Sequence, residues 1–325
     1  MKDWEDEVLE QYDIDVKNKK RVRNGVLCGC EQGVYLLGST TISEQRLGVL
    51  NHLTEELNQR GFGEVDEIFP NREGNLSCQL EDGSRYWVKK WFTGRECDVK
   101  KEQELLAATK NLAQLHKALD NPIEFEGNGS YQREDSQQVM FRRNRELKKV
   151  RSFIRQRVDK GEFESAFLKY FDSMYDWADG ALAKLKESNY KNLERKLVHG
   201  DYNYHNLLVL KDGMATTNFE HFGYQVQVED FYYFLRKAME KNQWDVKLGV
   251  RMIECYHKIK PISIDEMEYI SILFAYPEKF WKAANSYARS KKSWIPAKNM
   301  EKLELVIQQT KEKQIFLEKV FDFRL

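Results

Sequence analysis

The chain has 325 residues, and its 52 Lys and Arg residues are balanced by 52 Asp and Glu residues, so the formal net charge is zero. A neutral chain lacks the positive excess that is typical of proteins that bind nucleic acids or acidic membranes. Hydrophobic residues make up 41% of the sequence and aromatic residues 13%, which predicts a packed core and argues against a disordered protein.

The N-terminal stretch MKDWEDEVLEQYD is acidic and has no apolar segment, so we expect no signal peptide. The longest apolar run, residues 269–276, is too short to cross a bilayer, so we expect no membrane span. The cysteines are scattered, which predicts reduced, structural thiols in a cytoplasmic compartment, at Cys28, Cys30, Cys78, Cys97 and Cys255.

The first 94 residues have a mixed α/β pattern. A hairpin is expected over residues 21–38, with its turn at Glu31-Gln32-Gly33. The T-x-x-E pattern from Thr41 to Glu44 predicts the capping box of an amphipathic helix that ends near Gly61. Two further strands are expected at residues 75–81 and 85–92. This pattern predicts a small mixed lobe that ends at a hinge near residues 93–95.

From residue 95 onward the pattern is almost entirely helical, with one interruption at residues 196–220 that reads as a loop and a small hairpin around Lys211-Asp212-Gly213. We expect helices over residues 100–119, 141–159, 163–188, 228–242, 245–259, 264–289 and 299–321. A small lobe over residues 1–94 and a large helical lobe over residues 95–325 predict the α+β plan of a bilobal, protein-kinase-like fold. Ligands of such folds bind between the lobes.

The stretch HGDYNYHN at residues 199–206 has the D-x4-N spacing of a kinase catalytic loop. In such a loop Asp201 orients or accepts the proton of the attacking hydroxyl, and Asn206 binds a Mg²⁺ that bridges phosphates. A second metal ligand follows on the next hairpin, and Asn218 occupies that position. A chance match in a turn is the alternative, but the bilobal plan and the hairpin that follows favour the kinase-like loop.

This loop, the helix that ends in LAQLH at residue 116 and the segment VEDFYYFLRKAMEK from residue 228 resemble the aminoglycoside/choline-kinase superfamily. Residues 86–119 and the Asp-Phe-Tyr-Tyr-Phe-Leu-Arg-Lys helix resemble its spore coat protein S (CotS) branch, and the resemblance covers nearly the whole chain. It implies that Asp201 is the catalytic base, that Asn206 binds Mg²⁺, and that His199 and Asp230 support the loop. A helix N-terminal role is the alternative for Asp230.

The resemblance also implies ATP and Mg²⁺ as cofactors and other spore coat proteins as partners. The implied location is the spore coat, after synthesis in the mother-cell cytoplasm. Basic runs such as residues 141–157 lack the interleaved aromatic residues that stack on bases, so we expect no nucleic-acid partner. The aromatic segment FAYPEKFW, residues 274–281, is interpreted as core, with a substrate pocket as the alternative.

Two positions depart from the pattern of an active enzyme. Asn218 lacks the carboxylate that Mg²⁺ prefers, and Glu220, on the same strand face, is the candidate substitute ligand. Gly38 stands where relatives have the Lys that neutralises the nucleotide phosphates. The candidate nucleotide-binding residues lie on the strand before the hinge, with solvated strand-edge lysines as the alternative reading: Lys89, Lys90, Trp91 and Phe92.

Each departure is expected to reduce the rate of phosphoryl transfer by about 10²–10⁴. The sequence therefore predicts a spore-coat protein with impaired or lost catalysis. An active ATP- and Mg²⁺-dependent phosphotransferase acting on a small hydroxylated molecule is the alternative, and an inactive nucleotide-binding fold lies between the two. Placement of Glu220 and Lys89 near Asn206 would favour activity, whereas exposure of both to solvent would favour an interaction protein.

Overall fold

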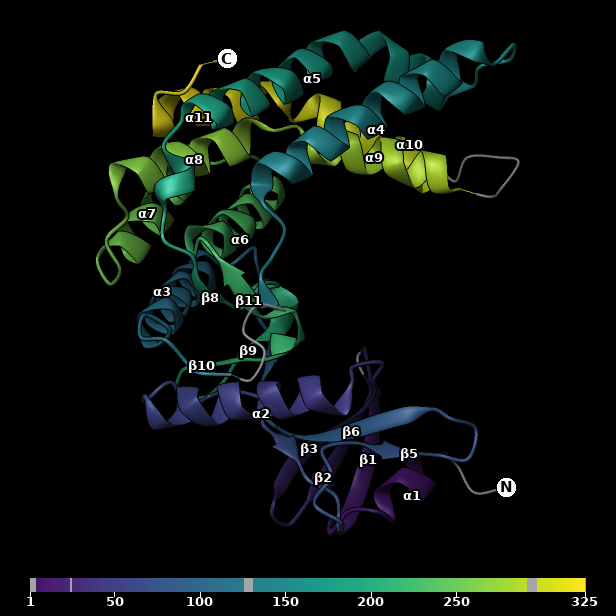
Figure 1. The fold of residues 1–325 in the computed structure, drawn as a ribbon, viewed down its shortest axis with the longest axis vertical. Helices are drawn as coiled ribbons and strands as arrows, with labels where there is room; N and C mark the ends of the chain where they lie inside the picture. The colour runs from purple at the N-terminus through teal and green to yellow at the C-terminus, as the bar shows by residue number, and fades with distance from the viewer. Residues whose placement is uncertain (1–3, 24, 126–130, 291–296, 325) are drawn as a thin grey trace. The chain divides into compact units, whose positions relative to one another are not determined.

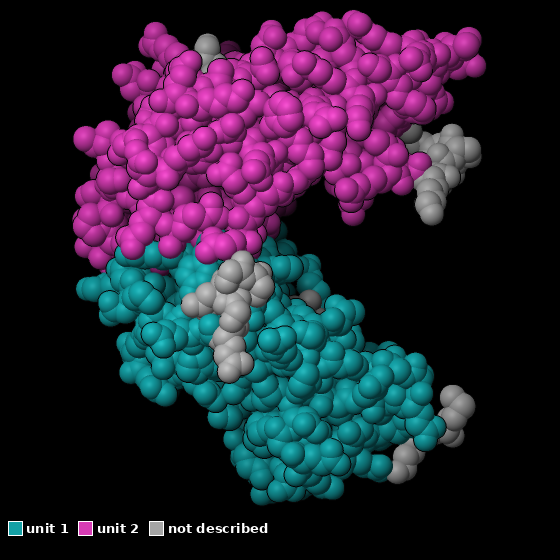
Figure 2. Space-filling view, in the orientation of Figure 1, with its two compact units in different colours: residues 1–131, 196–224 teal, residues 132–195, 225–325 magenta. Residues whose placement is uncertain are grey.

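The computed structural model describes residues 4–23, 25–125, 131–290 and 297–324. The chain forms two compact units (Figures 1 and 2). The first unit comprises Met1–Tyr131 and Lys196–Tyr224, and the second comprises Gln132–Arg195 and Gln225–Leu325. The loop at residues 199–206 therefore belongs to the same unit as the N-terminal strands. The expected lobe boundary near residue 94 stays a prediction.

An antiparallel sheet forms the N-terminal part of the first unit, with the strand order β1-β2-β3-β6-β4 and with β5 also paired to β6. Its strands are β1 (Val16–Val22), β2 (Gly25–Cys30), β3 (Gly33–Ser39), β4 (Ile68–Phe69), β5 (Cys78–Gln79) and β6 (Arg85–Trp91). Helix α1 (Trp4–Leu9) and Tyr12 pack on alternate apolar residues of β2 and β3, such as Cys28, Tyr35 and Leu37. The expected hairpin is confirmed, since β2 pairs with β3 across residues 31–32.

Helix α2 (Glu44–Gln59) follows β3, and its buried stripe is the expected one: Leu47, Leu50, Leu53 and Leu57. The expected capping box at Thr41–Glu44 is wrong. Ser43 is the N-cap and accepts a hydrogen bond from the Arg46 amide at 3.3 Å. The Glu44 carboxylate instead accepts hydrogen bonds from the Leu76 amide and the Ser77 hydroxyl, so it fastens the helix to the segment before β5.

The rest of the first unit carries the loop. Helix α3 (Glu102–Ala118) follows β7 (Arg95–Glu96), and β7 pairs with β9 (Leu207–Val209), which pairs with β10 (Met214–Thr216). Strands β9 and β10 are the hairpin expected around Lys211-Asp212-Gly213. Strand β8 (Lys196–Val198) precedes the loop and pairs with β11 (Gly223–Gln225). The loop at residues 199–206 is thus held between two short strand pairs.

The second unit is helical: α4 (Ser136–Gln156), α5 (Glu162–Glu187), α6 (Val228–Lys241), α7 (Val246–His257), α8 (Ile264–Ala275), α9 (Glu278–Arg289), α10 (Ala297–Gln308) and α11 (Thr310–Phe321). The Ser263–Glu266 capping box that begins α8 is present with both of its hydrogen bonds. No helix among these described residues is long and apolar enough to cross a membrane.

One helix expected over residues 264–289 is two helices in the structure. Pro277 separates α8 from α9, because proline has no amide hydrogen and disfavours helical geometry at the residue before it. The segment FAYPEKFW therefore turns a corner. Phe274 and Phe280 are buried on either side of that corner, so the core role expected for them is confirmed.

Glu229, in the first turn of α6, accepts a hydrogen bond from Tyr269 at 2.6 Å and lies beside Ser136. Burial raises the pKa of its carboxyl to about 7, from an ordinary value of 4.5. The folded protein holds this proton more tightly than the unfolded chain, so the carboxyl contributes stability that is lost as the pH rises through about 7.

A Glu229→Gln variant cannot ionise at this position. We expect its melting temperature, relative to the wild type, to be at least ~2 °C higher at pH 8 than at pH 5, which corresponds to roughly 1 kcal/mol. Thermal denaturation of both proteins at the two pH values measures this difference. An equal difference at both pH values would contradict the raised pKa.

Candidate phosphotransferase-like site

His199 anchors the loop to the hairpin that follows it. The ring is fully buried, and its Nε2 lies 3.0 Å from the carbonyl oxygen of Thr217, just after β10. Its Nδ1 accepts a hydrogen bond from the Asp201 amide at 3.2 Å. Gly200, between them, has a φ of 80°, which glycine adopts without strain. His199 and Gly200 therefore set the direction in which the loop leaves β8.

The loop brings together the side chains that the D-x4-N spacing predicts. Nδ2 of Asn206 donates to the carbonyl oxygen of Asp201 at 2.9 Å and to its Oδ2 at 3.1 Å. Nδ2 of Asn218 lies 3.4 Å from Oδ1 of Asn206. Asp201, Asn206 and Asn218 therefore form a continuous hydrogen-bonded row. Their assigned roles in proton transfer and metal binding stay predictions.

The backbone of Asn218 is left-handed, with φ 67° and ψ 54°, a conformation that Asn tolerates better than most residues. Its amide donates to both carboxylate oxygens of Asp66, each at 3.0 Å. Asp66 is only 3% exposed and lies just before β4, 152 residues away in sequence. The sequence analysis missed Asp66, because no motif surrounds it.

Lys89 lies on the other side of Asp66. Its Nζ donates to Oδ2 of Asp66 at 2.9 Å and lies 3.6 Å from Oε1 of Glu220. The interpretation of Lys89 as a solvated strand-edge residue is wrong, because β6 has partners on both sides and the lysine is 1% exposed. Lys90 points the opposite way, is exposed and pairs with Glu67 at 2.8 Å. Alternation along the strand separates the two lysines.

Gly38 faces the indole of Trp87. The two residues are partners in the β3–β6 register, and a Cβ on Gly38 would lie 2.5 Å from Cη2 of Trp87. The Nζ of Lys89 lies 4.3 Å from the centroid of the same ring. The indole therefore occupies the space next to the strand where a lysine at position 38 would begin.

Three predicted site residues remain, which are Trp91, Phe92 and Asp230. Trp91 and Phe92 are partly buried, with ring centroids 6.4 Å apart, and their nucleotide-binding role stays a prediction. Asp230 is 4% exposed in the first turn of α6, in the second unit, and its support of the loop also stays a prediction. His205, within the loop, contacts Glu96 at 2.7 Å.

The side chains in the row fit a Mg²⁺ ion poorly. Of the three, only Asp201 supplies a carboxylate, and the oxygen of Asn206 faces the amide nitrogen of Asn218. Glu220, the candidate substitute ligand, is paired with Lys89. Among the described residues, no group of three or more His, Cys, Asp or Glu side chains is arranged to hold a metal.

A family model described as "Spore coat putative kinase YutH" matches residues 5–320. The chain belongs to this spore coat family. The resemblance to spore coat protein S is also confirmed. The chain is 21% identical to "Spore coat protein S" of Bacillus subtilis (strain 168), over 97% of this chain and 93% of that protein.

Solved structures show the fold of this spore coat family member. An aminoglycoside phosphotransferase from Alicyclobacillus acidocaldarius matches with a TM-score of 0.85 at 16% identity, over 97% of this chain and 94% of that chain. A spectinomycin phosphotransferase, crystallised with ADP and spectinomycin, matches with a TM-score of 0.66 at 13% identity, over 93% and 95% of the two chains. These matches confirm the expected α+β, kinase-like fold.

Proposed function

We propose that this chain is a spore-coat component whose phosphotransferase-like fold has impaired or lost phosphoryl transfer. The observation that carries the proposal is the set of contacts around Asn218. Its side chain contacts Asn206, and its backbone amide contacts Asp66. Polar groups that an active site would direct at Mg²⁺ and phosphates are here bonded to one another.

The charges around Asp66 support the same conclusion. Phosphoryl transfer depends on cations that neutralise the phosphates and on carboxylates that hold the metal. The buried cation, Lys89, already faces two carboxylates, those of Asp66 and Glu220. At position 38, Trp87 fills the space that a second lysine would need. The site is therefore organised as a stable buried network.

Membership in the spore coat family supports the remainder of the proposal. The protein would be made in the mother-cell cytoplasm, deposited on the spore and bound there to other coat proteins. In this role the protein would act by binding through its surface, so loss of catalytic turnover would not impair its function.

An active phosphotransferase is the second candidate, and one observation favours it. Lys89 contacts both Asp66 and Glu220, Asp66 contacts Asn218, and neither Lys89 nor Glu220 is solvated like Lys90. Of the two outcomes set out for Lys89 and Glu220, this arrangement is closer to placement near Asn206, which favours activity, than to exposure of both side chains to solvent. Asp201 would then act as the base toward a small hydroxylated substrate.

Calorimetric titration of ATP, with and without Mg²⁺, separates the two candidates. We expect the wild type to show no Mg²⁺-dependent binding up to about 1 mM ATP, because the metal ligands are incomplete. The Asn218→Asp variant adds a carboxylate where the family pattern has one. It is expected to bind Mg²⁺-ATP at least about tenfold more tightly than the wild type.

The same variant gives a readout that does not depend on turnover. The introduced carboxylate would join those of Asp66, Asp201 and Glu220, so repulsion should lower the variant's melting temperature without metal, and Mg²⁺ should restore it. Micromolar, Mg²⁺-dependent binding by the wild type that is lost in Asp201→Asn would contradict the proposal and support the phosphotransferase.

A further inference from the structure

The second unit contains a cavity of about 240 Å³ between α5, α6, α9, α10 and α11. It includes the corner formed by residues 276–279, which the sequence analysis singled out as core or substrate pocket. Indole rings of Trp177 and Trp244 contribute aromatic surface, and Leu305 and Val306 contribute aliphatic surface. The shape and apolar surface are suited to a small organic molecule.

The charged residues around this apolar surface are unbalanced. The cavity is lined by five cations, which are Arg236, Lys279, Lys282, Lys302 and Lys313. It is lined by two carboxylates, Glu240 and Glu278, so five minus two leaves a formal charge of +3. The chain as a whole is neutral, so this concentration of positive charge is a local feature. It favours an anionic ligand.

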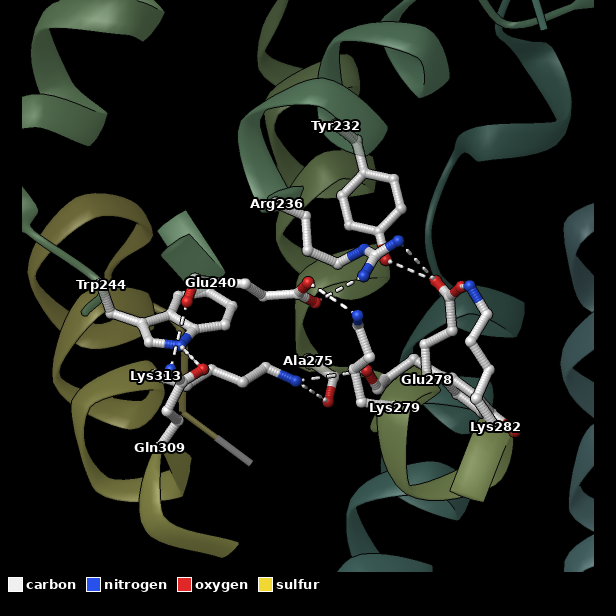
Figure 3. A network of polar contacts seen from close by, with 11 residues as sticks. Tyr232, Arg236, Glu240, Trp244, Ala275, Glu278, Lys279, Lys282, Gln309 and Lys313 are labelled. Atoms are coloured by element: carbon white, nitrogen blue, oxygen red, sulfur yellow. Dashed lines mark hydrogen bonds and ion pairs between the residues drawn. The ribbon is translucent and has the colours of Figure 1, made fainter. Parts of the chain in front are cut away.

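Both carboxylates are already engaged. Glu240 contacts Arg236 at 2.5 Å and Lys279 at 3.0 Å. Glu278 contacts Lys282 at 2.5 Å and lies 3.5 Å from Nη2 of Arg236 (Figure 3). Arg236 is 3% exposed, and its Nε and Nη2 atoms have no hydrogen bond among the described residues. Its guanidinium therefore keeps donors that the two carboxylates leave unsatisfied.

Lys313 on α11 is a partly buried cation of the lining, whereas Lys302 on α10 is exposed. The Nζ of Lys313 contacts only carbonyl oxygens in this network, those of Ala275 at 3.4 Å and Tyr276 at 3.2 Å (Figure 3). No ion pair links Lys313 to a carboxylate in the part of the chain that the structure describes. The Nζ lies 5.7 Å and 6.0 Å from the ring centroids of Trp177 and Trp244. Burial, followed by the nearby Arg236, lowers its pKa to about 7.

Trp244 has an unfavourable backbone conformation, and hydrogen bonds hold its side chain in place. Gln243 and Trp244 have φ values of 52° and 58°, in a region that side chains other than glycine rarely adopt. The indole Nε1 donates to Gln309 at 3.2 Å, and Gln309 in turn donates to the carbonyl oxygen of Glu240 at 3.1 Å. The ring is thus fixed beside Lys313 by contacts to α6 and to the residue between α10 and α11.

We propose that this cavity binds a small aromatic carboxylate, with its ring against Trp177 and Trp244 and its carboxylate beside Lys313, in the field of Arg236. An apolar ring matches the indole surface, and a single negative charge matches the partly buried Lys313, which has no ion pair among the described residues. A doubly charged inorganic phosphate is expected to bind less well, since it would lose more hydration and gain no ring contact. The site shares no residue with the loop at residues 199–206.

Titration with 3-phenylpropionate tests the proposal, with the neutral 3-phenylpropanamide and inorganic phosphate as comparison ligands. We expect calorimetry to show saturable binding of the carboxylate to the full chain, and at least about tenfold weaker binding of the amide and of phosphate. The variant Lys313→Met keeps the apolar stem and is expected to weaken carboxylate binding at least about tenfold. Lys311→Met, an exposed lysine on the same helix, is the matched control and should bind like the wild type.

The affinity should also fall as the pH rises from about 6 to 8.5, because only the protonated form of Lys313 attracts the anion. The other charged groups that line the cavity are Arg236 and Glu240 from α6, Glu278, Lys279 and Lys282 from α9, and Lys302 from α10. Thermal denaturation should show Lys313→Met to be folded. The proposal is overturned by an absence of binding at about 10 mM carboxylate. It is also overturned by equal binding of the amide, or by unchanged binding in Lys313→Met.

Discussion

Replacement of Lys89 by Met is expected to lower the free energy of unfolding by about 3–5 kcal/mol. The methionine retains the apolar stem, but Asp66 then stays buried, at 3% exposure, without the cation that contacts it at 2.9 Å. An uncompensated buried carboxylate is among the most destabilising changes known for a folded protein. Urea denaturation of the wild type and the variant measures the difference.

The neighbouring lysine provides the matched control. Lys90 also lies on β6 and pairs with a carboxylate, that of Glu67, at 2.8 Å, but it is exposed to solvent. Lys90→Met is expected to change the free energy of unfolding by less than about 1 kcal/mol, since water screens this pair. Similar losses for the two variants would show that the contact between Lys89 and Asp66 is not a buried pair that stabilises the fold.

A Cβ at Gly38 is expected to destabilise the first unit. Gly38→Ala would place this atom 2.5 Å from the Trp87 ring, so the buried indole or the β3–β6 pairing must shift. Overpacking of this kind typically lowers the free energy of unfolding by about 1–3 kcal/mol. A Gly38→Lys variant, made to restore the family pattern, should be at least as unstable for the same reason.

Gly48, within α2, is the control for this prediction. A Cβ there meets nothing within 4 Å, so Gly48→Ala should stabilise the helix by about 0.5–1 kcal/mol. Replacing Trp87 by Leu in the Gly38→Ala background should remove the clash, so the two losses should be less than additive. Additive losses would mean that the indole does not fill the space beside Gly38.

If these predictions hold, the contacts around Asp66 and Gly38 stabilise the fold. Lys89, Asp66 and Asn218 are bonded to one another, and Trp87 covers Gly38. Active sites usually hold polar groups ready for a ligand at the expense of stability. If Lys89→Met is strongly destabilised and the wild type does not bind Mg²⁺-ATP, then Lys89, Asp66 and Asn218 will have been shown to stabilise the fold and not to support turnover.

Local patterns in the sequence were sufficient for much of the fold. The 3.6-residue stripes of α2 and α3, the Lys211-Asp212-Gly213 turn and the Ser263–Glu266 capping box each depend on neighbours within a few residues. The D-x4-N spacing likewise brought Asp201 and Asn206 into contact, because one loop carries both. The break at Pro277 was missed because apolar residues continue on both sides of it, and the N-cap at Ser43 was missed because Thr41 and Glu44 also have capping-box spacing.

The amino-acid pattern was therefore enough to predict the kinase-like class of the fold and the position of the loop, and the family resemblance implied the two departures at Gly38 and Asn218. What those departures mean depended on the folded chain. The pairing of β3 with β6 sets Trp87 opposite Gly38, and the contact between Asp66 and Asn218 joins residues 152 positions apart. Folding likewise placed Lys313 among residues from four other helices. Burial and charge pairing depend on such long-range contacts, and no pattern of neighbouring residues encodes them.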